Sequence, residues 1–227
     1  MEIIAGIHKV DGVNCNCYII IGKDHHELTL IDTGLPGSAG AILNYVRHLG
    51  MTPKDVKRII LTHGHPDHTG SLDALRKATG AKVAVHRVEA DFISGKKPLP
   101  ERDKSLISEV VQQMIKLAPI RPDILLDEGQ EISGLLVFHV PGHTPGSIAL
   151  LDRKRNAIFV GDAMWVVNKN SVEAPIQQFT WNPKLAIKSI RKIASLDFDI
   201  LLGGHGEPLR PDASGKVRKL LMKLKGG

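Results

Sequence analysis

The stretch Leu61-Thr62-His63-Gly64-His65-Pro66-Asp67-His68-Thr69-Gly70 places three histidines and an aspartate close together in the sequence. It overlaps the end of Val56–Thr62, a compact apolar run that is typical of a buried strand. Neutral imidazole and carboxylate groups are ligands for zinc and similar divalent metals. A loop at the end of a strand can turn several such side chains toward one point, whereas a regular helix or strand would scatter them. The stretch therefore predicts a metal site on a strand-end loop.

Three further segments, each after an expected strand, carry a possible ligand beside glycines. His143 lies in the turn Val140-Pro-Gly-His-Thr-Pro-Gly146, Asp162 follows the apolar Phe159-Val-Gly, and His205 lies in Leu201-Leu-Gly-Gly-His-Gly. Glycine allows backbone and side chains to approach one another closely. Each segment alone is more typical of an ordinary turn, and the first stretch alone could be a histidine-rich surface loop. Together they predict one metal centre.

The remaining six histidines have no comparable setting, and we expect none of them to bind metal. His48 ends an expected helix, where its charge suits the helix dipole, and His86 closes an expected strand. The others are His8, His25, His26 and His139.

Strand and helix patterns occur in both halves of the chain. Strands are expected at Glu2–Val10, Asn16–Gly22, Glu27–Asp32, Val56–Thr62, Lys82–His86, Leu135–Val140, Ser147–Leu151, Ala157–Val160 and Asp199–Leu202. Helices are expected at Pro36–Leu49, Ser71–Thr79, Lys104–Leu117 and Pro183–Ser195, and an exposed loop at residues 94–102. Strands in both halves favour two sheets packed face to face with helices outside. The pattern alone does not separate this arrangement from a doubly wound sheet.

The composition is that of a globular protein, with 42% hydrophobic and 24% charged residues among 227. We expect a single domain over residues 1–227. The formal net charge is +6, and Lys216–Lys225 contains basic residues and no acidic one. Its leucines recur at helical spacing, so we expect a basic C-terminal helix within residues 211–227. Such a charge run is usually a solvated face, and binding of a polyanion is the alternative.

Cys15 and Cys17 are one residue apart on an expected strand, where a disulfide between them would be strained. We expect buried thiols rather than metal ligands. The first residues lack the pattern of a signal peptide, and no apolar run approaches the length of a membrane span. We therefore expect a soluble, cytoplasmic protein.

The motifs above resemble those of the metallo-β-lactamase superfamily, in which H-x-H-x-D-H is followed by separate His, Asp and His motifs. The resemblance is to the glyoxalase II-like (hydroxyacylglutathione hydrolase-like) branch, and it extends from the opening strands to Pro208. It implies an α/β fold, the αββα sandwich of two mixed β-sheets with helices on the outer faces. It also implies the metal ligands, with His63, His65 and His143 at a first metal, Asp67, His68 and His205 at a second, and Asp162 bridging. Asp32-Thr-Gly34 matches a further turn of the family, which implies that Asp32 supports the ligand loop.

The implied activity is that of a dinuclear metal-dependent hydrolase. Zinc is favoured by the many histidines, with iron or manganese as alternatives. Two such ions would activate a bridging hydroxide and polarise a carbonyl group, and Asp67 would orient the hydroxide or move its proton. We expect a small thioester, ester or lactone as substrate. Trp165 occupies the place where lactonases of the family have a tyrosine, and we expect it to line the substrate pocket.

Two residues narrow the choice within the family. Antibiotic-degrading β-lactamases lack an aspartate at the position of Asp162, and flavodiiron oxygen reductases carry glutamate at the position of His65. Two alternatives stay open. One is a mononuclear iron persulfide dioxygenase, and the other is a phosphodiesterase or nucleic-acid-binding protein that uses the basic tail. Aromatic residues form only 4% of the chain, too few to suggest base-stacking platforms, so we expect a small-molecule substrate. The sequence leaves the oligomeric state open.

Overall fold

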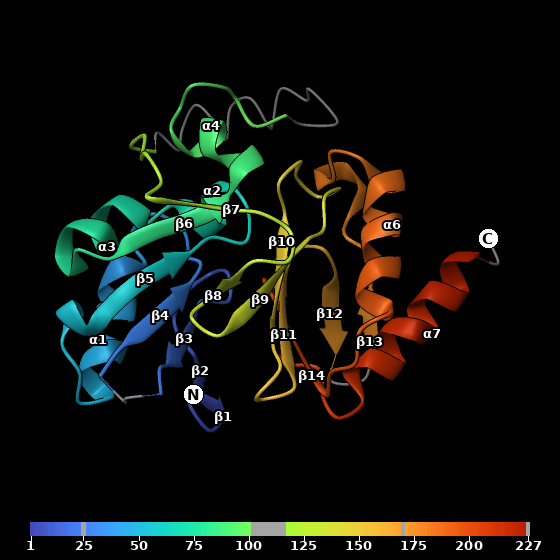
Figure 1. The fold of residues 1–227 in the computed structure, drawn as a ribbon, viewed down its shortest axis with the longest axis horizontal. Coiled ribbons are helices and arrows are strands. Elements are labelled where there is room, and N and C mark those ends of the chain that lie inside the picture. The colour runs from blue at the N-terminus through green and yellow to red at the C-terminus, as the bar shows by residue number, and fades with distance from the viewer. Residues whose placement is uncertain (24–25, 101–116, 169–170, 226–227) are drawn as a thin grey trace. The chain divides into compact units, whose positions relative to one another are not determined.

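The computed structural model of the protein describes residues 1–23, 26–100, 117–168 and 171–225 (Figure 1). The chain forms two compact units. Unit 1 spans Met1–Leu99 and Ser105–Leu126, and unit 2 spans Pro100–Lys104 and Asp127–Gly227. The organisation of residues 1–227 as a single domain stays a prediction.

Three of the sequence predictions fall on residues outside the described ranges. They concern His25, the end of the loop at 94–102, and all of the helix at Lys104–Leu117 except its last residue.

Unit 1 is built on a mixed sheet of seven strands in the order of the sequence. The strands are β1 (Glu2–Ile4), β2 (Ile7–Lys9), β3 (Tyr18–Ile21), β4 (Leu28–Ile31), β5 (Val56–Ile60), β6 (Lys82–His86) and β7 (Ile124–Leu126). Neighbours from β1 to β4 pair antiparallel, and those from β4 to β7 pair parallel. The expected strand Glu2–Val10 is instead a hairpin of two strands, because Gly6 adopts a left-handed φ of 76° and reverses the chain.

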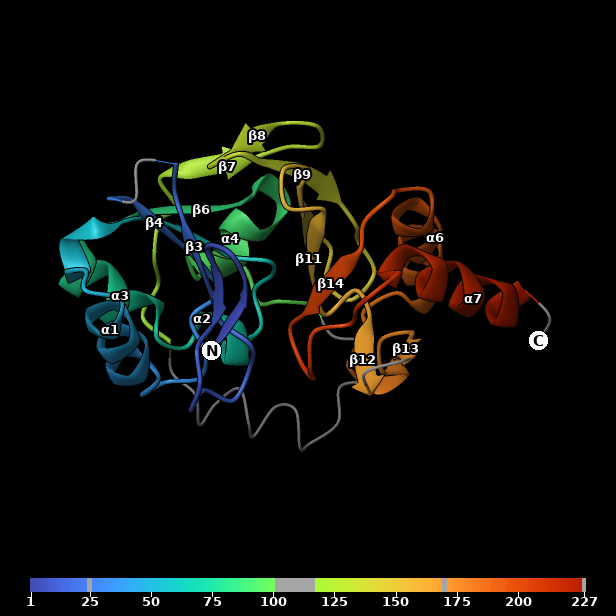
Figure 2. The ribbon, with the colours of Figure 1, turned by 90° about the horizontal axis from the view of Figure 1, so that it is seen from below.

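The helices of unit 1 follow the strands of its parallel half. They are α1 (Ala39–His48), η1 (Pro53–Asp55), α2 (Pro66–Thr69), α3 (Leu72–Thr79), η2 (Arg87–Glu89) and α4 (Ala90–Ile93). Helices α1 and α3 lie side by side on one face of the sheet (Figures 1 and 2). Ile42 and Val46 on α1 are buried there, and so is Leu75 on α3. Helix α1 begins at Ala39 rather than at the expected Pro36, because the preceding Ser38 closes a turn onto Leu35.

Unit 2 has a mixed sheet of five strands in the order β14-β11-β10-β9-β8, and a separate two-stranded sheet, β12-β13. The strands are β8 (Glu131–Ile132), β9 (Leu135–His139), β10 (Ile148–Asp152), β11 (Ala157–Gly161), β12 (Trp165–Asn168), β13 (Ser171–Glu173) and β14 (Ile200–Gly203). The helices are η3 (Gln177–Phe179), α6 (Pro183–Ala194) and α7 (Ala213–Lys225). The sequence did not predict β7, β8, β12 and β13, which are too short to show a clear alternation.

Helix α7 is part of the hydrophobic core of unit 2. Ala213 and Val217 are fully buried, and Leu220 is 7% exposed. These side chains pack in the same cluster as residues of α6 and β14. Arg218, one of the basic residues of the tail, forms an ion pair with Asp197 and donates to the carbonyl oxygen of Ala194. The tail is therefore an amphipathic helix that stabilises the unit, with some of its charge used in local contacts.

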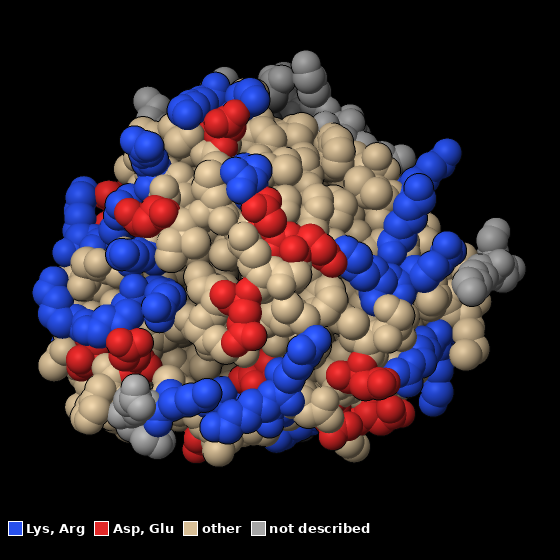
Figure 3. All heavy atoms as spheres, viewed as in Figure 1, with Lys and Arg blue, Asp and Glu red and all other residues tan. Residues whose placement is uncertain are grey.

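Charged side chains of both signs lie near one another on the face shown in Figure 3. Lysines and arginines form several separate groups there, and acidic side chains lie among them. Within the part of the chain that the structure describes, no helix is both long enough and apolar enough to cross a lipid bilayer.

The two cysteines precede β3 instead of lying on a strand, which corrects the sequence prediction. Both are fully buried thiols with 3.9 Å between their sulfur atoms. The hydrogen bond with Cys17, together with burial, raises the pKa of the Cys15 thiol far above its usual range. Because thiolate is the form that binds metals, this environment disfavours Cys15 as a ligand.

The packing of α7 generates a stability prediction. Leu220→Ala should lower the free energy of unfolding by about 2–4 kcal/mol, because it removes a buried side chain and leaves a cavity. Lys219→Ala, a neighbouring exposed position on the same helix, should change it little. Urea unfolding of both variants measures the difference. Equal effects would mean that α7 does not pack into the core as described.

Candidate metal centre

One edge of the unit 1 sheet gathers residues that the sequence singled out. Strands β4 and β5 are parallel neighbours, so the segments that follow them leave the sheet at the same edge. Asp32 follows β4, and the loop that carries His63 follows β5. The topology thus brings together two motifs separated by about thirty positions in the sequence.

Proline determines how the ligand loop turns. His65 is extended, with φ −67° and ψ 149°, as is favoured for a residue before proline. Pro66 then occupies the first turn of α2, where its missing N–H costs nothing. The carbonyl oxygen of His65 accepts from the backbone N–H groups of His68 and Thr69 at 3.0 and 3.1 Å. This short helical turn folds the sequence His-Pro-Asp-His back on itself.

The four possible ligands of this loop lie close together. The ring centroid of His63 is 4.9 Å from that of His65 and 4.1 Å from that of His68. Nε2 of His63 is 3.1 Å from Nδ1 of His65, and Nε2 of His68 is 3.6 Å from a carboxylate oxygen of Asp67. His63 and His68 are buried, whereas the Asp67 side chain is 34% exposed. The loop therefore places four possible ligand groups next to one another, and the carboxylate of Asp67 is partly exposed to solvent.

The buried carboxylate of Asp32 forms hydrogen bonds with two residues of this loop. One oxygen accepts from Thr62 N–H at 2.8 Å, and the other accepts from the Thr62 hydroxyl at 2.7 Å. The second oxygen is also 2.8 Å from Nδ1 of His68. A carboxylate only accepts hydrogen bonds, so Nδ1 of His68 carries the proton and Nε2 keeps its lone pair. The Nε2 atom of His68 is thus the one left available to a metal ion, and the supporting role of Asp32 stays a prediction.

The same carboxylate acts on His63 through Thr62. The Thr62 hydroxyl has one proton and gives it to Asp32, so it can only accept from Nδ1 of His63, which lies 3.1 Å away. His63 is thereby also fixed with the lone pair on Nε2. The sequence analysis missed Thr62, although its place between the strand and the first histidine was visible.

A second contact anchors α2 to the turn after β4. Both the backbone N–H and the hydroxyl of Thr33 donate to the carbonyl oxygen of His68, at 2.7 and 2.8 Å. Gly70 passes so close to Pro36 that a Cβ there would lie 2.3 Å from its ring. Asp32 itself has a left-handed φ of 58°, a conformation that aspartate tolerates better than most residues.

Glu89 is a further buried group beside the loop that the sequence analysis did not select. It is fully buried at the end of η2. A Cβ on Gly64, between the first two histidines, would lie 2.6 Å from its carboxylate. Glycine at this position therefore lets a buried acid approach the backbone of the ligand loop. A lone glutamate in a short turn offers no sequence signal for such a contact.

Three strand ends of unit 2 also meet at one edge of their sheet. Strands β11 and β14 are parallel, and β10 runs antiparallel to β11. The ends of β11 and β14 and the start of β10 consequently lie on the same side. These ends carry Asp162, His205 and the turn that contains His143, respectively.

The carboxylate of Asp162 lies between the two histidines. Its Oδ2 atom is 3.6 Å from Nε2 of His143 and 3.5 Å from Nε2 of His205. Asp162 and His143 are buried, and the His205 side chain is 23% exposed. One carboxylate oxygen of unit 2 thus lies near the Nε2 atoms of two histidines.

The turn that holds His143 is fixed by close backbone packing. Gly142, with φ 141°, lies where a Cβ would be 2.3 Å from the backbone nitrogen of Ala186 in α6. Asn182 N–H donates to the Gly142 carbonyl at 2.8 Å, and Trp181 N–H donates to the His143 carbonyl at 3.0 Å. The start of α6 therefore positions the turn that carries His143.

Trp165 stacks on a predicted ligand. At the start of β12, its ring system is 4.9 Å from that of His205 at an interplanar angle of 27°. The sequence predicted that Trp165 lines a substrate pocket, and that role stays a prediction.

The described histidines outside these motifs have other structural roles. His8 is buried against Tyr45, and burial lowers its pKa. His86 accepts from Val88 N–H at 3.3 Å, and Nε2 of His139 is 2.9 Å from the carbonyl oxygen of Pro145. Among the described residues, no group of three possible ligands close enough for one metal ion includes any of them.

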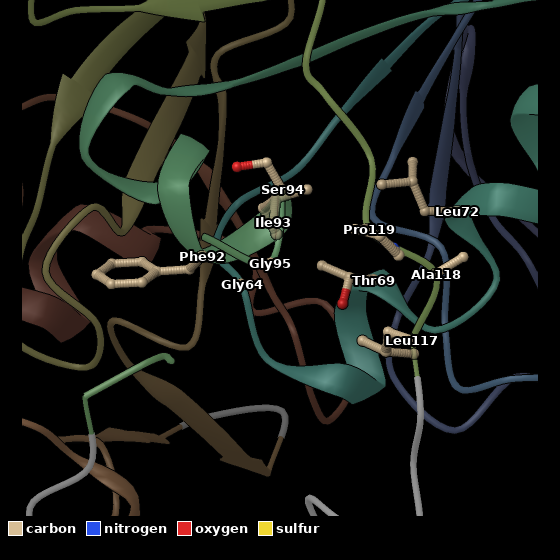
Figure 4. A pocket seen from close by; sticks show the side chains of 10 residues that line it. All are labelled: Gly64, Thr69, Leu72, Phe92, Ile93, Ser94, Gly95, Leu117, Ala118 and Pro119. Carbon is tan, nitrogen blue, oxygen red and sulfur yellow. The ribbon is translucent and has the colours of Figure 1, made fainter. Parts of the chain in front are cut away.

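A cavity of about 380 Å³ lies next to the ligand loop in unit 1 (Figure 4). Three segments surround it, namely the ligand loop with the start of α3, the end of α4, and residues 117–119. Polar and apolar atoms contribute about equally to its surface, and Thr69 and Ser94 supply side-chain hydroxyls. The lining residues are Gly64, Thr69, Leu72, Phe92, Ile93, Ser94, Gly95, Leu117, Ala118 and Pro119.

Comparison with known proteins identifies the family. Residues 10–205 match the model of the metallo-β-lactamase superfamily. The chain is 30% identical to a probable metallo-hydrolase, YflN, of Bacillus subtilis, over 92% of this chain and 86% of that protein. It is 27% identical to the hydroxyacylglutathione hydrolase GloC of Haemophilus influenzae, over 85% of both chains. The chain therefore belongs to the metallo-β-lactamase superfamily, and its relatives include hydrolases of the glyoxalase II type.

Solved structures confirm the predicted fold class. A metallo-β-lactamase family protein from Thermus thermophilus matches with a TM-score of 0.74 at 24% identity, over 99% of this chain and 81% of that one. The protein thus has the metallo-β-lactamase fold, with two mixed sheets and helices. Membership of this superfamily of metallo-hydrolases supports a metal-dependent hydrolase.

The contacts of Asp32 generate a prediction on metal affinity. Asp32→Asn should weaken metal binding by about 10- to 100-fold, the usual effect of losing a carboxylate partner of a ligand histidine. Asp73→Asn is the control, because Asp73 is a surface residue of α3 paired with Lys77. Competition with a chromophoric chelator measures both affinities. Wild-type affinity in Asp32→Asn would contradict the role derived for this carboxylate.

Proposed function

We propose that the protein is a dinuclear metal-dependent hydrolase that cleaves a small thioester, ester or lactone. The observation that carries the proposal is the position of Asp162, whose buried carboxylate oxygen lies within 3.6 Å of two histidine nitrogens in unit 2. A carboxylate in that setting suits a ligand shared by two ions. The family and the four ligand groups of unit 1 support the same assignment.

The donor set fits divalent metals. Imidazole and carboxylate groups together suit zinc, iron and manganese, and the tautomers fixed by Asp32 and Thr62 leave Nε2 lone pairs on two histidines. In the proposed arrangement His63, His65 and His143 hold one ion, and Asp67, His68 and His205 hold the other. Seven ligands exceed the four that a structural zinc site uses, which favours a catalytic site.

The chain's own residues have distinct roles in the proposed reaction. Bound metals would supply acidified water and a positive charge opposite the developing oxyanion. The partly exposed carboxylate of Asp67 would hold the proton taken from the attacking water, since solvent and substrate can reach it. The buried Asp162 has no such access, so its role is to bind and to keep the ligand histidines in place.

The substrate proposal combines leaving-group chemistry with the shape of unit 1. A thiol has a pKa of about 8.5, so a thiolate departs without a strong acid. An amide nitrogen would need a well-placed proton donor, and the motifs provide none beyond Asp67. The cavity beside the ligand loop has apolar side chains such as Leu72, Phe92 and Ile93 in its wall, which can contact an acyl group. Ser94 and Gly95 line that cavity and belong to the loop at residues 94–102 that we propose shapes the pocket.

Replacing the proposed shared ligand tests the metal assignment. Wild-type protein should hold two ions per chain, and Asp162→Ala should lose the second ion and orders of magnitude in turnover. His48→Ala, at an exposed position on α1, should keep both ions and nearly full activity. Elemental analysis with steady-state kinetics measures both effects. Similar behaviour of the two variants would refute the ligand assignment, and activity with a single iron and oxygen would favour the dioxygenase alternative.

A panel of substrates with matched acyl groups tests the reaction class. We expect the highest kcat/KM for thioesters, lower values for activated esters and lactones, and almost no turnover of unstrained amides or β-lactams. The order follows from the ease with which each leaving group departs. A clear preference for a phosphodiester would overturn the proposal and favour the alternative that uses the basic tail.

A further inference from the structure

The indole of Trp165 lies against a residue proposed to bind metal. Its centroid separation of 4.9 Å and tilt of 27° from His205 fall in the range of offset-stacked aromatic pairs. The chain has only two tryptophans. Both Trp165 and His205 belong to unit 2, so the contact is internal to one compact unit.

Gly206 allows the His205 loop to approach β12 closely, and Gly203 lies within van der Waals range of the same region. A Cβ on Gly206, which has φ 84°, would lie 2.2 Å from the Val166 carbonyl oxygen. A Cβ on Gly203 would lie 3.6 Å from the Met164 carbonyl oxygen and from a Val166 side-chain carbon. The backbones on both sides of His205 therefore run against the strand that carries Trp165. The stacked indole therefore limits the rotation of the His205 ring, whose Nε2 also lies 3.5 Å from Asp162.

The indole N–H does not take part in the stacking contact with His205. Trp165 Nε1 is buried, and none of the described residues accepts a hydrogen bond from it. A buried donor is inaccessible to a substrate carbonyl unless the chain moves. The face of the ring, and not its polar edge, is thus the part of Trp165 that meets the candidate metal centre.

We propose that Trp165 is a positioning residue that holds the His205 ring in its metal-binding orientation and favours the metal-bound state. An imidazole that shares its lone pair with a divalent ion gains positive charge, and the face of an indole attracts positive charge. The stack is therefore stronger with metal bound than without it. The inference rests on the proposed function, because it requires His205 to be a ligand.

The affinity of the second ion is the quantity that distinguishes this role. Trp165→Ala should weaken it by about 10- to 100-fold, as removal of a group supporting a metal ligand does, and should leave the first ion in place. Trp165→Phe should stay within a small factor of wild type, because phenylalanine keeps an aromatic face and lacks only the N–H. Val167→Ala, at an exposed position two residues along β12, should change neither affinity.

The experiment is a zinc titration of metal-free protein against a chromophoric chelator, for the wild type and these three variants. Circular dichroism and thermal unfolding confirm that each variant is folded. A parallel cobalt titration in Trp181→Phe protein, where Trp165 is the one remaining tryptophan, follows indole fluorescence. Open-shell Co²⁺ bound to His205 should quench this emission when the second ion binds. Protein with both Trp181→Phe and His205→Ala should lose the quenching of that step.

Each outcome supports or overturns the inference. Selective loss of the second ion in Trp165→Ala, with retention in Trp165→Phe and Val167→Ala, supports it. Two ions bound with wild-type affinity by Trp165→Ala would overturn the positioning role and leave the proposed function intact. Equal losses in the Ala and Phe variants would also overturn it, since the indole N–H would then be the important group. Wild-type protein that binds no second ion would overturn both proposals.

Discussion

The hydrogen bonds of Asp32 are the constraint on which the ligand loop of unit 1 depends. This buried carboxylate fixes the tautomer of His68 directly and that of His63 through the Thr62 hydroxyl. A buried charge is tolerated only when its oxygens are bonded, so the loop and the carboxylate stabilise each other. The parallel pairing of β4 and β5 places them at the same edge of the sheet. The pairing of these two strands thus allows Asp32 to fix which nitrogen of each histidine carries a lone pair.

The sequence predicted the fold class and the ligand-bearing segments because their signals are local. The apolar run before His63 and the proline after His65 indicated a strand followed by a turn, and the structure confirms both. Glycines beside His143 and His205 indicated tight turns, and the close backbone contacts of Gly142 and Gly206 explain why no other residue fits there.

The sequence could not predict contacts between segments that are distant along the chain. Nothing in the pattern places Glu89 beside the backbone of Gly64, or the ring of Trp165 on that of His205. These contacts depend on how turns pack after the strands are formed. Strands β12 and β13 have only four and three residues, so their sequences show no clear alternation of apolar and polar residues. The cysteines were expected on a strand, and they instead lie in the buried segment before β3.

The central proposal is that the seven ligands predicted from the sequence hold two metal ions. Anomalous diffraction from crystals of zinc-loaded protein, recorded on either side of the zinc absorption edge, tests it most directly. The account predicts two peaks, one bound by His63, His65 and His143 and the other by Asp67, His68 and His205. Asp162 should reach both. A single peak that leaves the second set of ligands unused, or peaks bound elsewhere, would contradict it.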